Sequence, residues 1–238
     1  MNGCDGMGIK AVVFDGDKTL FYGLKKETKI RKLLEKKRIF FDEMEIKKAF
    51  GLSLKIRDLL IDRKLLRLGD DAYLLENQIR LILLGVECKR SLVLAQYLCD
   101  HWTGASDKKV FDDVKETLKQ LKKFRIKIGL LTAGSSSSYI KTLKETNLFH
   151  YFDAVIGEDI TNVPKPALIA YLMVVQKLGV SPSEAVMVGD HVENDYAGPL
   201  KAGLNAVLID RENSLSRKYK KINSLKELLP LIKQLNNG

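Results

Sequence analysis

The chain has 238 residues, of which 45% are hydrophobic and 29% are charged. These proportions are typical of a globular protein and exclude wholesale disorder and fibrous repeats. The formal net charge of +10 would permit nucleic-acid binding. However, 30 of the 40 basic residues are Lys, and they lie in short groups between acidic residues, as solvated helix surfaces do. We therefore expect no nucleic-acid partner.

Three features of the chain concern its location. Residues 1–6 are small, polar and acidic, so we expect an extension outside the fold and no targeting signal. The longest unbroken apolar run, residues 167–175, is much shorter than the ~20 residues of a membrane span. The three cysteines show no Cys-x-x-Cys spacing, which argues against a disulfide framework and a structural zinc site. We expect a cytoplasmic protein that does not bind a membrane.

The first predicted strand, residues 9–14, is a run of β-branched and aromatic residues. From about residue 21 to residue 103 we expect no strand. Apolar residues at helical spacing there predict helices over Thr28–Lys37, Glu43–Phe50, Leu54–Arg63, Asp71–Leu84 and Cys88–Trp102. Glycines 51, 69 and 85 are predicted to form the turns between these helices. The segment therefore indicates an all-helical insert.

Strands and helices alternate again after residue 106. The predicted strands are Ile126–Leu131, Ala154–Ile156, Ala185–Val188 and Ala206–Ile209, and the predicted helices are Val110–Phe124, Ser137–Asn147, Pro166–Leu178, Asn194–Ala202 and Ser224–Leu235. This alternation predicts a doubly wound α/β fold, in which a parallel sheet is covered on both faces. We expect a Rossmann-like core of residues 1–20 and 105–238, interrupted by a helical cap of residues 21–104.

Polar residues follow four successive predicted strands, at the edge where such sheets bind ligands. They are Asp15 and Asp17 after the first strand, Thr132 after the second, Lys165 after the third, and Asp190 and Asp195 after the fourth. Each alone is compatible with a helix cap or a surface position. Two carboxylates directly after a buried strand, however, are costly unless they meet a cation or hydrogen bonds. Together the residues indicate one functional site.

Four segments resemble, in order, the motifs of the haloacid dehalogenase-like hydrolase superfamily. They are VVFDGDKTL (residues 12–20), LLTAG (130–134), Lys165-Pro166 and GDHVENDYAG (189–198). The resemblance spans about residues 9–209 and implies a helical cap at the position of residues 21–103. Two residues depart from the pattern: Ala133 stands where Asn is frequent, and Gly16 stands where an apolar residue is frequent. The first would remove a phosphate contact, and the second would loosen the loop that carries Asp15.

The paired carboxylates predict hydrolysis of a phosphate ester. Asp15 is the expected nucleophile, which forms an aspartyl-phosphate, and Asp17 is the expected general acid and base. A phosphomonoester dianion repels a carboxylate, so we expect Mg²⁺ to neutralise both. Asp15 and Asp190 can supply oxygen ligands to this ion. The resemblance adds the backbone carbonyl of Asp17.

The remaining residues at the strand ends are expected to bind the phosphoryl group of the substrate or to orient the groups around it. Thr132 and Lys165 should bind the transferring phosphoryl oxygens. Asp195 should orient a metal-bound water or the lysine. The helix after Gly134 is expected to point free N–H groups toward the site. For the serines of residues 135–138 we favour the interpretation of ordinary helix caps.

Asp17 also distinguishes between activities. Loss of a halide needs no proton, so an acid at this position favours phosphate ester hydrolysis over dehalogenation. The expected substrate is a small phosphorylated metabolite. A phosphomutase, a 2-haloacid dehalogenase and a non-catalytic basic binding protein are the alternatives.

Some features of the predicted cap and its borders remain open. Residues 21–103 contain 18 Lys and Arg against 12 Asp and Glu, which fits equally an electropositive lid and a solvated helical bundle. The glycines at the two crossings, residues 21–23 and 103–105, suit a hinge. His101 and Trp102 are expected to pack locally, although they could line the pocket. His191 could border the metal or stand beside a helix N-cap.

Overall fold

The computed structural model describes residues 8–24, 26–67, 70–102 and 108–237. The predicted N-terminal extension of residues 1–6, the turn at Gly69 and the second crossing at residues 103–105 lie outside these ranges. The chain divides into two compact units. One comprises Met1–Tyr22 and Lys109–Gly238, and the other comprises Gly23–Lys108.

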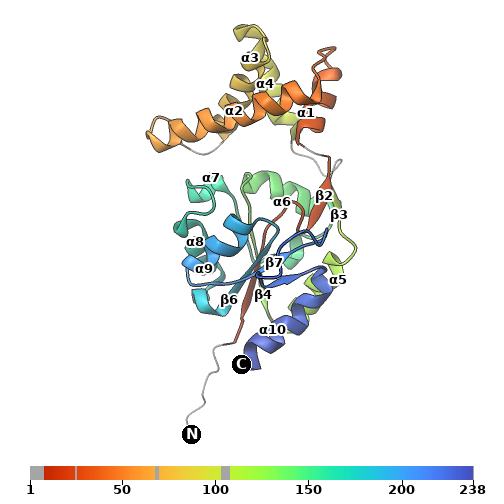
Figure 1. The fold of residues 1–238 in the computed structure, drawn as a ribbon, viewed down its shortest axis with the longest axis vertical. Coiled ribbons are helices and arrows are strands. Elements are labelled where there is room, and N and C mark those ends of the chain that lie inside the picture. The colour runs from red at the N-terminus through yellow and green to blue at the C-terminus, as the bar shows by residue number, and fades with distance from the viewer. Residues whose placement is uncertain (1–7, 25, 68–69, 103–107, 238) are drawn as a thin grey trace. The chain divides into compact units, whose positions relative to one another are not determined.

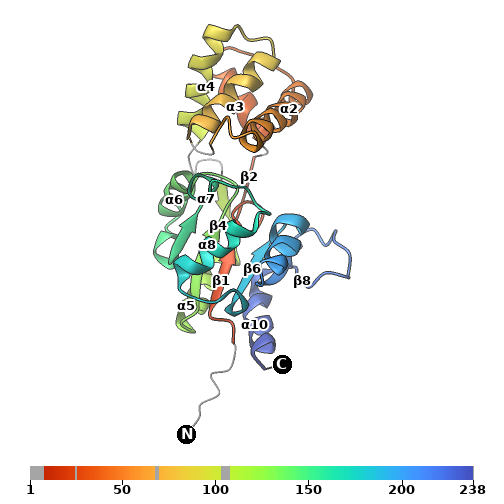
Figure 2. The same ribbon diagram turned by 90° about the vertical axis from the view of Figure 1, so that its left-hand side faces the viewer.

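The larger unit is built on a parallel sheet. Among the described residues, its strands follow the order β5 (Ala154–Ile156), β4 (Lys127–Leu131), β1 (Ala11–Phe14), β6 (Ala185–Gly189), β7 (Asn205–Ile209) and β8 (Lys221–Ile222). Figure 2 shows β1 in the middle, between β4 and β6. Val12 pairs with Ile128 on one side and with Val186 on the other. The strands that carry the predicted site residues are therefore neighbours.

Helices cover both faces of this sheet, which confirms the predicted doubly wound fold. Helices α5 (Val114–Lys123), α6 (Ser136–Glu145) and α10 (Leu228–Asn237) pack on one face, and α8 (Leu168–Leu178) with the short α9 (Gly198–Lys201) packs on the other (Figure 1). Val12 and Phe14 enter the first core, whereas Ala11 and Val13 enter the second. Because β1 is buried on both faces, its residues are apolar without alternation.

Two short strands were not predicted near the border of the units. Strand β2 (Phe21–Gly23) pairs with β3 (Lys108–Val110), so the expectation of no strand after residue 21 is wrong. This pairing also explains why the helix predicted from Val110 begins only at Val114. A strand of three residues carries no clear periodicity, and its stability comes from a partner about 85 residues away in the chain.

The smaller unit consists of α1 (Lys26–Glu35), α2 (Glu43–Asp62), α3 (Asp70–Leu83) and α4 (Cys88–Trp102). The turn predicted at Gly51 is wrong, because α2 runs through it. A Cβ at Gly51 would meet nothing within 4 Å, and glycine in an exposed helix interior costs only about 1 kcal/mol relative to alanine. The buried residues Ile46 and Ala49 before it and Ser53 after it keep the helix intact. Gly85, with φ of +83°, forms the predicted turn.

A buried ionic cluster lies inside the helical unit. Glu76 accepts hydrogen bonds from Arg57, at 3.0 Å, and from Arg80. The guanidinium of Arg80 also lies 4.2 Å from the ring centre of Phe50. Buried arginines need such partners because an unpaired buried charge is costly.

None of the described helices of the chain combines the length and the apolar character needed to cross a membrane.

Candidate active site

Lys165 lies at the centre of the predicted site residues. Its ammonium group donates hydrogen bonds to Oδ1 of Asp15 at 2.7 Å, to Oδ1 of Asp195 at 2.7 Å and to the carbonyl oxygen of Leu131 at 3.2 Å. These three acceptors use its full donor capacity. Burial opposes the charged form, but the two carboxylates outweigh it and raise the pKa of Lys165. The lysine is therefore a fixed positive charge among carboxylates.

Asp15 follows β1 directly, and its backbone N–H donates to the carbonyl oxygen of Val188 on the adjacent β6 at 2.8 Å. Burial raises the pKa of Asp15 to about 6, against the lowering effect of Lys165. The nearby Asp195 and Asp17 raise it further. One lysine therefore does not fully offset the cost of this buried carboxylate, and a further cation would stabilise its charged form.

Asp190 belongs to the same carboxylate cluster. Oxygen atoms of Asp15, Asp190 and Asp195 all lie within 4.8 Å of one another. Burial and the charge of Asp15 raise the pKa of Asp190, against the effect of Lys18, whose ammonium lies 3.6 Å from it. Clustered carboxylate oxygens are the ligands that Mg²⁺ prefers. The donor set therefore fits a divalent cation.

Asp195 is engaged on both oxygens by groups of the protein. Oδ1 accepts from Lys165, and Oδ2 accepts from the backbone N–H of His191 at 3.1 Å. Its side chain is 1% exposed. These contacts place Asp195 against the lysine, in line with the orienting role predicted for it, although it also belongs to the carboxylate cluster.

Two residues that the sequence reasoning missed hold Asp195 in place. A Cβ at Gly189 would lie 2.3 Å from Cγ of Asp195, so only glycine admits this carboxylate. The hydroxyl of buried Tyr171 donates to the carbonyl oxygen of Asn194 at 2.6 Å. This bond anchors the π-helical turn η4 (Val192–Ala197) that carries Asp195. The glycine of the fourth motif could have indicated the close approach of Gly189 to Asp195. Nothing in the local sequence indicated the hydrogen bond of Tyr171 to Asn194.

Thr132 and Asp17 are brought together by a third residue, Tyr139 of α6. The hydroxyl of Tyr139 has side-chain hydrogen bonds with both of them. Burial and the charges of Asp17 and Asp15 raise the pKa of Tyr139 well above its ordinary value. Thr132 is 3% exposed and accepts from the backbone N–H of Gly134 at 3.1 Å. The sequence reasoning did not select Tyr139.

Two of the backbone N–H groups at the N-terminus of α6, which were predicted to be free, have partners within the protein. The backbone N–H of Ser136 donates to Oδ1 of Asp159 at 2.7 Å, and the Ser136 hydroxyl donates to Oδ2 at 2.6 Å. The N–H of Ser138 donates to the side chain of Ser135 at 3.2 Å. These N–H groups are thus satisfied within the protein, and Asp159 partly offsets the helix dipole. The interpretation of Ser135 as a helix cap is confirmed.

The two histidines that the sequence analysis singled out, His101 and His191, have local contacts. Nδ1 of His191 accepts from the backbone N–H of Asn194 at 3.2 Å and caps η4. Nδ1 of His101 lies 2.9 Å from the carbonyl oxygen of Tyr97, one helical turn earlier. The side chain of Trp102 lies outside the described part of the structure. These contacts agree with the local interpretation of both histidines, while their predicted roles at the pocket and the metal stay predictions.

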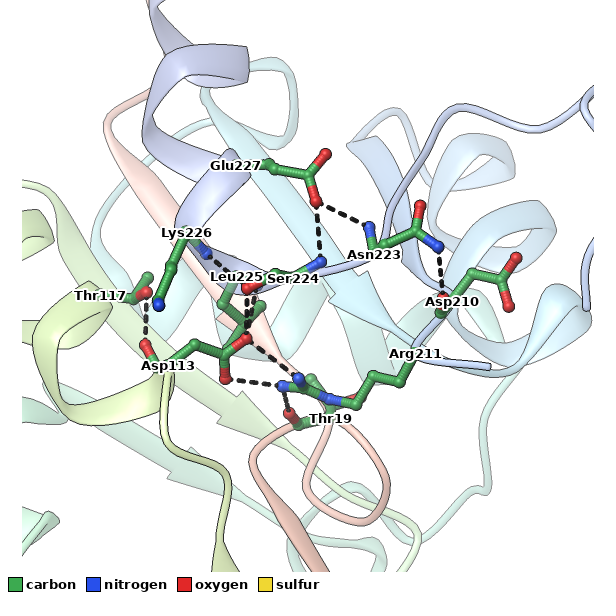
Figure 3. Close-up of polar contacts among 10 residues, drawn as sticks. All are labelled: Thr19, Asp113, Thr117, Asp210, Arg211, Asn223, Ser224, Leu225, Lys226 and Glu227. Carbon is green, nitrogen blue, oxygen red and sulfur yellow. Dashed lines mark hydrogen bonds and ion pairs between the residues drawn. The ribbon is translucent and has the colours of Figure 1, made fainter. Parts of the chain in front are cut away.

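Arg211, two residues after β7, connects the loop after β1 to the rest of the core (Figure 3). Its guanidinium donates to both carboxylate oxygens of Asp113 at 3.0 Å and to the carbonyl oxygen of Thr19 at 2.7 Å. Asp113 also accepts from the hydroxyl of Ser224 at 2.7 Å and from the N–H of Leu225 at 2.9 Å. One arginine thus connects the loop after β1, the start of α5 and the segment before α10.

Comparison with known proteins gives consistent matches. A model of the haloacid dehalogenase-like hydrolase family matches residues 9–203. The glyceraldehyde 3-phosphate phosphatase of Methanopyrus kandleri is 28% identical over 217 residues, which cover 85% of this chain and 84% of the relative. The ribulose-1,5-bisphosphate 5-phosphatase of Halopiger xanaduensis is 36% identical over 98 residues, or 41% of either chain.

Solved structures show the same fold. A haloacid dehalogenase-like phosphatase from Thermococcus onnurineus aligns with a TM-score of 0.61 and 27% identity, over 94% of this chain and 98% of that one. A 2-haloacid dehalogenase from Pseudomonas syringae aligns with a TM-score of 0.71 and 22% identity, over 95% of this chain and 99% of that one. The second similarity concerns the fold alone.

Proposed function

Because the chain belongs to the haloacid dehalogenase-like hydrolase family, we propose that it is a Mg²⁺-dependent phosphomonoesterase that acts on a small phosphorylated metabolite. The two curated relatives described above are phosphatases, and the chain is a phosphatase of this family. The observation that carries the finer proposal is the position of Lys165 between Asp15 and Asp195, next to Asp190.

Asp15 is the proposed nucleophile. Lys165 binds its Oδ1 atom, and we assign the attack on phosphorus to Oδ2. An O–P bond forms to Asp15 while the ester O–P bond breaks, and the electron pair leaves with the alkoxide. Water then attacks phosphorus, the bond to Asp15 breaks, and inorganic phosphate is released. Two displacements of this kind replace one more difficult reaction.

Asp17 is the proposed general acid and base. It gives its proton to the leaving alkoxide in the first step and takes a proton from water in the second. Asp17 lies two residues after the nucleophile, and Tyr139 links it to Thr132. Its presence favours a phosphatase over a dehalogenase, since a halide leaves without a proton.

Thr132 and Lys165 are proposed to bind the phosphoryl oxygens, and Lys165 would then exchange its hydrogen bond to the Leu131 carbonyl for one to the phosphoryl group. Lys165 is buried and keeps its charge through two carboxylates, so it can offset negative charge at the phosphoryl group. The side chains of Asp15 and Asp190, with the backbone carbonyl of Asp17, would hold Mg²⁺. When bound, the ion would reduce the repulsion between the phosphate dianion and the nucleophile. Asp195 would keep Lys165 in position.

We also propose that residues 21–104 act as a cap that restricts access to small substrates. The unit Gly23–Lys108 is compact by itself, and its surplus of basic residues would attract anions. The identity of the phosphate ester is to be read from activity on a panel of sugar phosphates, triose phosphates, glycolate phosphate and nucleotides.

The test is phosphate release from this panel, with Mg²⁺ and with excess chelator, by the wild type and by Asp15→Asn. We expect turnover only by the wild type with Mg²⁺, because an amide cannot act as an anionic nucleophile. Ca²⁺ should restore less activity than Mg²⁺, since it accepts up to eight ligands and could hold Asp15 bidentate. The exposed Asp62→Asn is the matched control and should retain full activity.

Three results would contradict the proposal. Phosphate release by Asp15→Asn near the wild-type rate would reject the covalent mechanism, and full activity in excess chelator would reject the metal site. Halide release from a 2-haloacid without a metal would favour a dehalogenase. Transfer of the phosphoryl group to a second sugar hydroxyl rather than to water would favour a mutase.

A further inference from the structure

The ring of Tyr139 occupies the space that a side chain at Gly16 would take. An ideal Cβ at Gly16 would lie 2.2 Å from Cε1, 2.6 Å from Cζ and 2.7 Å from the hydroxyl oxygen of Tyr139. These distances are below any normal carbon contact, so the ring lies against the backbone between Asp15 and Asp17. Tyr139 is 5% exposed and belongs to the core on that face of the sheet.

A second glycine accommodates the same ring. A Cβ at Gly134 would lie 3.1 Å from Cε2 of Tyr139, which is tighter than an ordinary contact. The ring therefore lies between the loop after β1 and the loop after β4. In the sequence Gly16 was expected to loosen the nucleophile loop. In the folded protein the missing side chain is replaced by one that comes from α6, more than a hundred residues later.

The hydroxyl of Tyr139 connects two residues of the proposed mechanism. It has side-chain hydrogen bonds with Asp17 and with Thr132. An ionised carboxylate only accepts, so the phenol donates to Asp17 in that state. The backbone N–H of Gly134 donates in turn to Oγ1 of Thr132. A continuous series of hydrogen bonds thus runs from Gly134 through Thr132 and Tyr139 to Asp17.

We propose that Tyr139 is a positioning residue that orients the Asp17 carboxylate toward the leaving group and aligns it with the Thr132 hydroxyl. This inference rests on the proposed function, in which Asp17 transfers protons and Thr132 binds the phosphoryl group. A carboxylate beside a glycine-containing loop can rotate, and a hydrogen bond on one oxygen orients the other. Tyr139 itself contacts neither substrate nor reacting atoms in this scheme.

The same arrangement has a consequence for Thr132. The Thr132 and Tyr139 hydroxyls each have a single hydrogen. When Asp17 is ionised it can only accept, so it takes the hydrogen of Tyr139, and the bond between the two hydroxyls uses the hydrogen of Thr132. Binding of a phosphoryl oxygen to the Thr132 hydroxyl therefore competes with the bond to Tyr139. We expect Tyr139→Phe to leave Thr132 free for the phosphoryl group while Asp17 loses its orientation. In this variant, substrate binding should stay the same or become tighter, whereas proton transfer to the leaving group should become slower.

The first test compares Tyr139→Phe with the wild type on an alkyl phosphate and on a nitrophenyl phosphate. Because Tyr139→Phe removes a hydrogen bond to a charged group, we expect kcat for the alkyl ester to fall about 10- to 100-fold. KM should stay the same or fall. Formation of the phosphoenzyme from the nitrophenyl ester should be nearly unchanged, because that leaving group needs no proton. Tyr151→Phe, at a partly buried tyrosine of the same unit, is the control and should behave as wild type.

Equal kcat for Tyr139→Phe and wild type on the alkyl ester would overturn the positioning role. An equal loss on both esters would also overturn it, since that pattern indicates general disruption of the site. If the wild-type protein hydrolyses neither these esters nor any ester of the metabolite panel, the proposed function fails and the positioning role fails with it. The packing of Tyr139 against Gly16 is then decided by the second test.

A second test does not depend on activity. We expect Gly16→Ala to destabilise the protein strongly, because its Cβ would overlap the ring, and Tyr139→Ala to remove that overlap. The double variant Gly16→Ala/Tyr139→Ala should lose clearly less stability in urea unfolding than the sum of the two single variants. Additive losses would show that Tyr139 does not fill the space at Gly16, and the proposal would be wrong.

Discussion

The ammonium group of Lys165 lies 2.7 Å from Oδ1 of Asp195, and the two side chains are 3% and 1% exposed. Lys165→Met would leave Asp195 and the nearby Asp15 without their shared cation. Removal of one partner of a buried ion pair costs about 3–5 kcal/mol, and we expect this loss in the free energy of unfolding at pH 7.5. Urea denaturation measures it, and phosphatase activity should also be lost.

The control for this prediction is the exposed ion pair of Lys122 and Asp153, at 2.8 Å. Lys122→Met should cost no more than about 1 kcal/mol, because solvent screens exposed pairs. Mg²⁺ should recover part of the stability of Lys165→Met, since a ligand that binds only the folded state stabilises it. Equal losses for the two variants would contradict the structural role of Lys165.

Asp17→Asn should separate the two chemical steps. The variant keeps the nucleophile and the backbone carbonyl of residue 17, but it loses the proton donor and the base, which contribute about 10²–10⁴ in rate. With an alkyl phosphate the first step should be slow. With a nitrophenyl phosphate the first step should survive, and aspartyl-phosphate should accumulate on Asp15. Rapid-quench measurement should show a burst followed by slow turnover; the same loss on both esters without trapped phosphoenzyme would remove Asp17 from this role.

Arg211→Lys should weaken the connection shown in Figure 3. Lysine keeps the charge but cannot reproduce the two bonds to Asp113 and the third to the carbonyl of Thr19. We expect a loss of about 1–3 kcal/mol in the free energy of unfolding. We also expect a lower kcat, because Thr19 lies in the loop that carries Asp15, the proposed nucleophile. The exposed Arg217→Lys is the control, and an unchanged unfolding midpoint for Arg211→Lys would contradict the prediction.

Asp210 should make the stability of the protein depend on pH in the acid range. Burial alone would raise its pKa, but the hydrogen bonds from Lys221 and from the N–H groups of Leu215 and Ser214 outweigh burial and hold the pKa at about 2. Its ordinary value is 3.8, so the folded state binds this proton less readily than the unfolded state. The contribution of Asp210 to the free energy of unfolding is present in full above pH 4 and is lost as the pH falls from 3.8 toward 2.

The measurement is the difference in unfolding free energy between the wild type and Asp210→Asn from pH 6 to pH 3. We expect a constant difference above pH 4 that shrinks below it. Comparison with the variant removes the contribution of other carboxylates, such as Asp113, whose pKa is also lowered. A difference that does not change with pH would show that Asp210 is not held in this way.

The sequence by itself predicted the elements whose signals are local. The apolar run before Asp15, the alternation of strands and helices after residue 106, and the helical periodicity between residues 28 and 102 lie within short windows. The parallel sheet follows from them, because alternating strands and helices pack in few ways. Parallel strands also end at one sheet edge, so the sequence could predict that Asp15, Lys165 and Asp190 would meet there.

The tertiary structure decided what depends on contacts between distant parts of the chain. Gly51 looked like a helix end, but packing on both sides of it keeps α2 continuous. The backbone N–H of Ser136 at the start of α6 was expected to be free, but Asp159 of α7 (Glu158–Thr161) accepts its hydrogen bond. Gly16 looked like a weak point, but Tyr139 fills it. In each case the deciding atom lies outside the local segment, and propensity and periodicity carry no information about such a neighbour until the chain has folded.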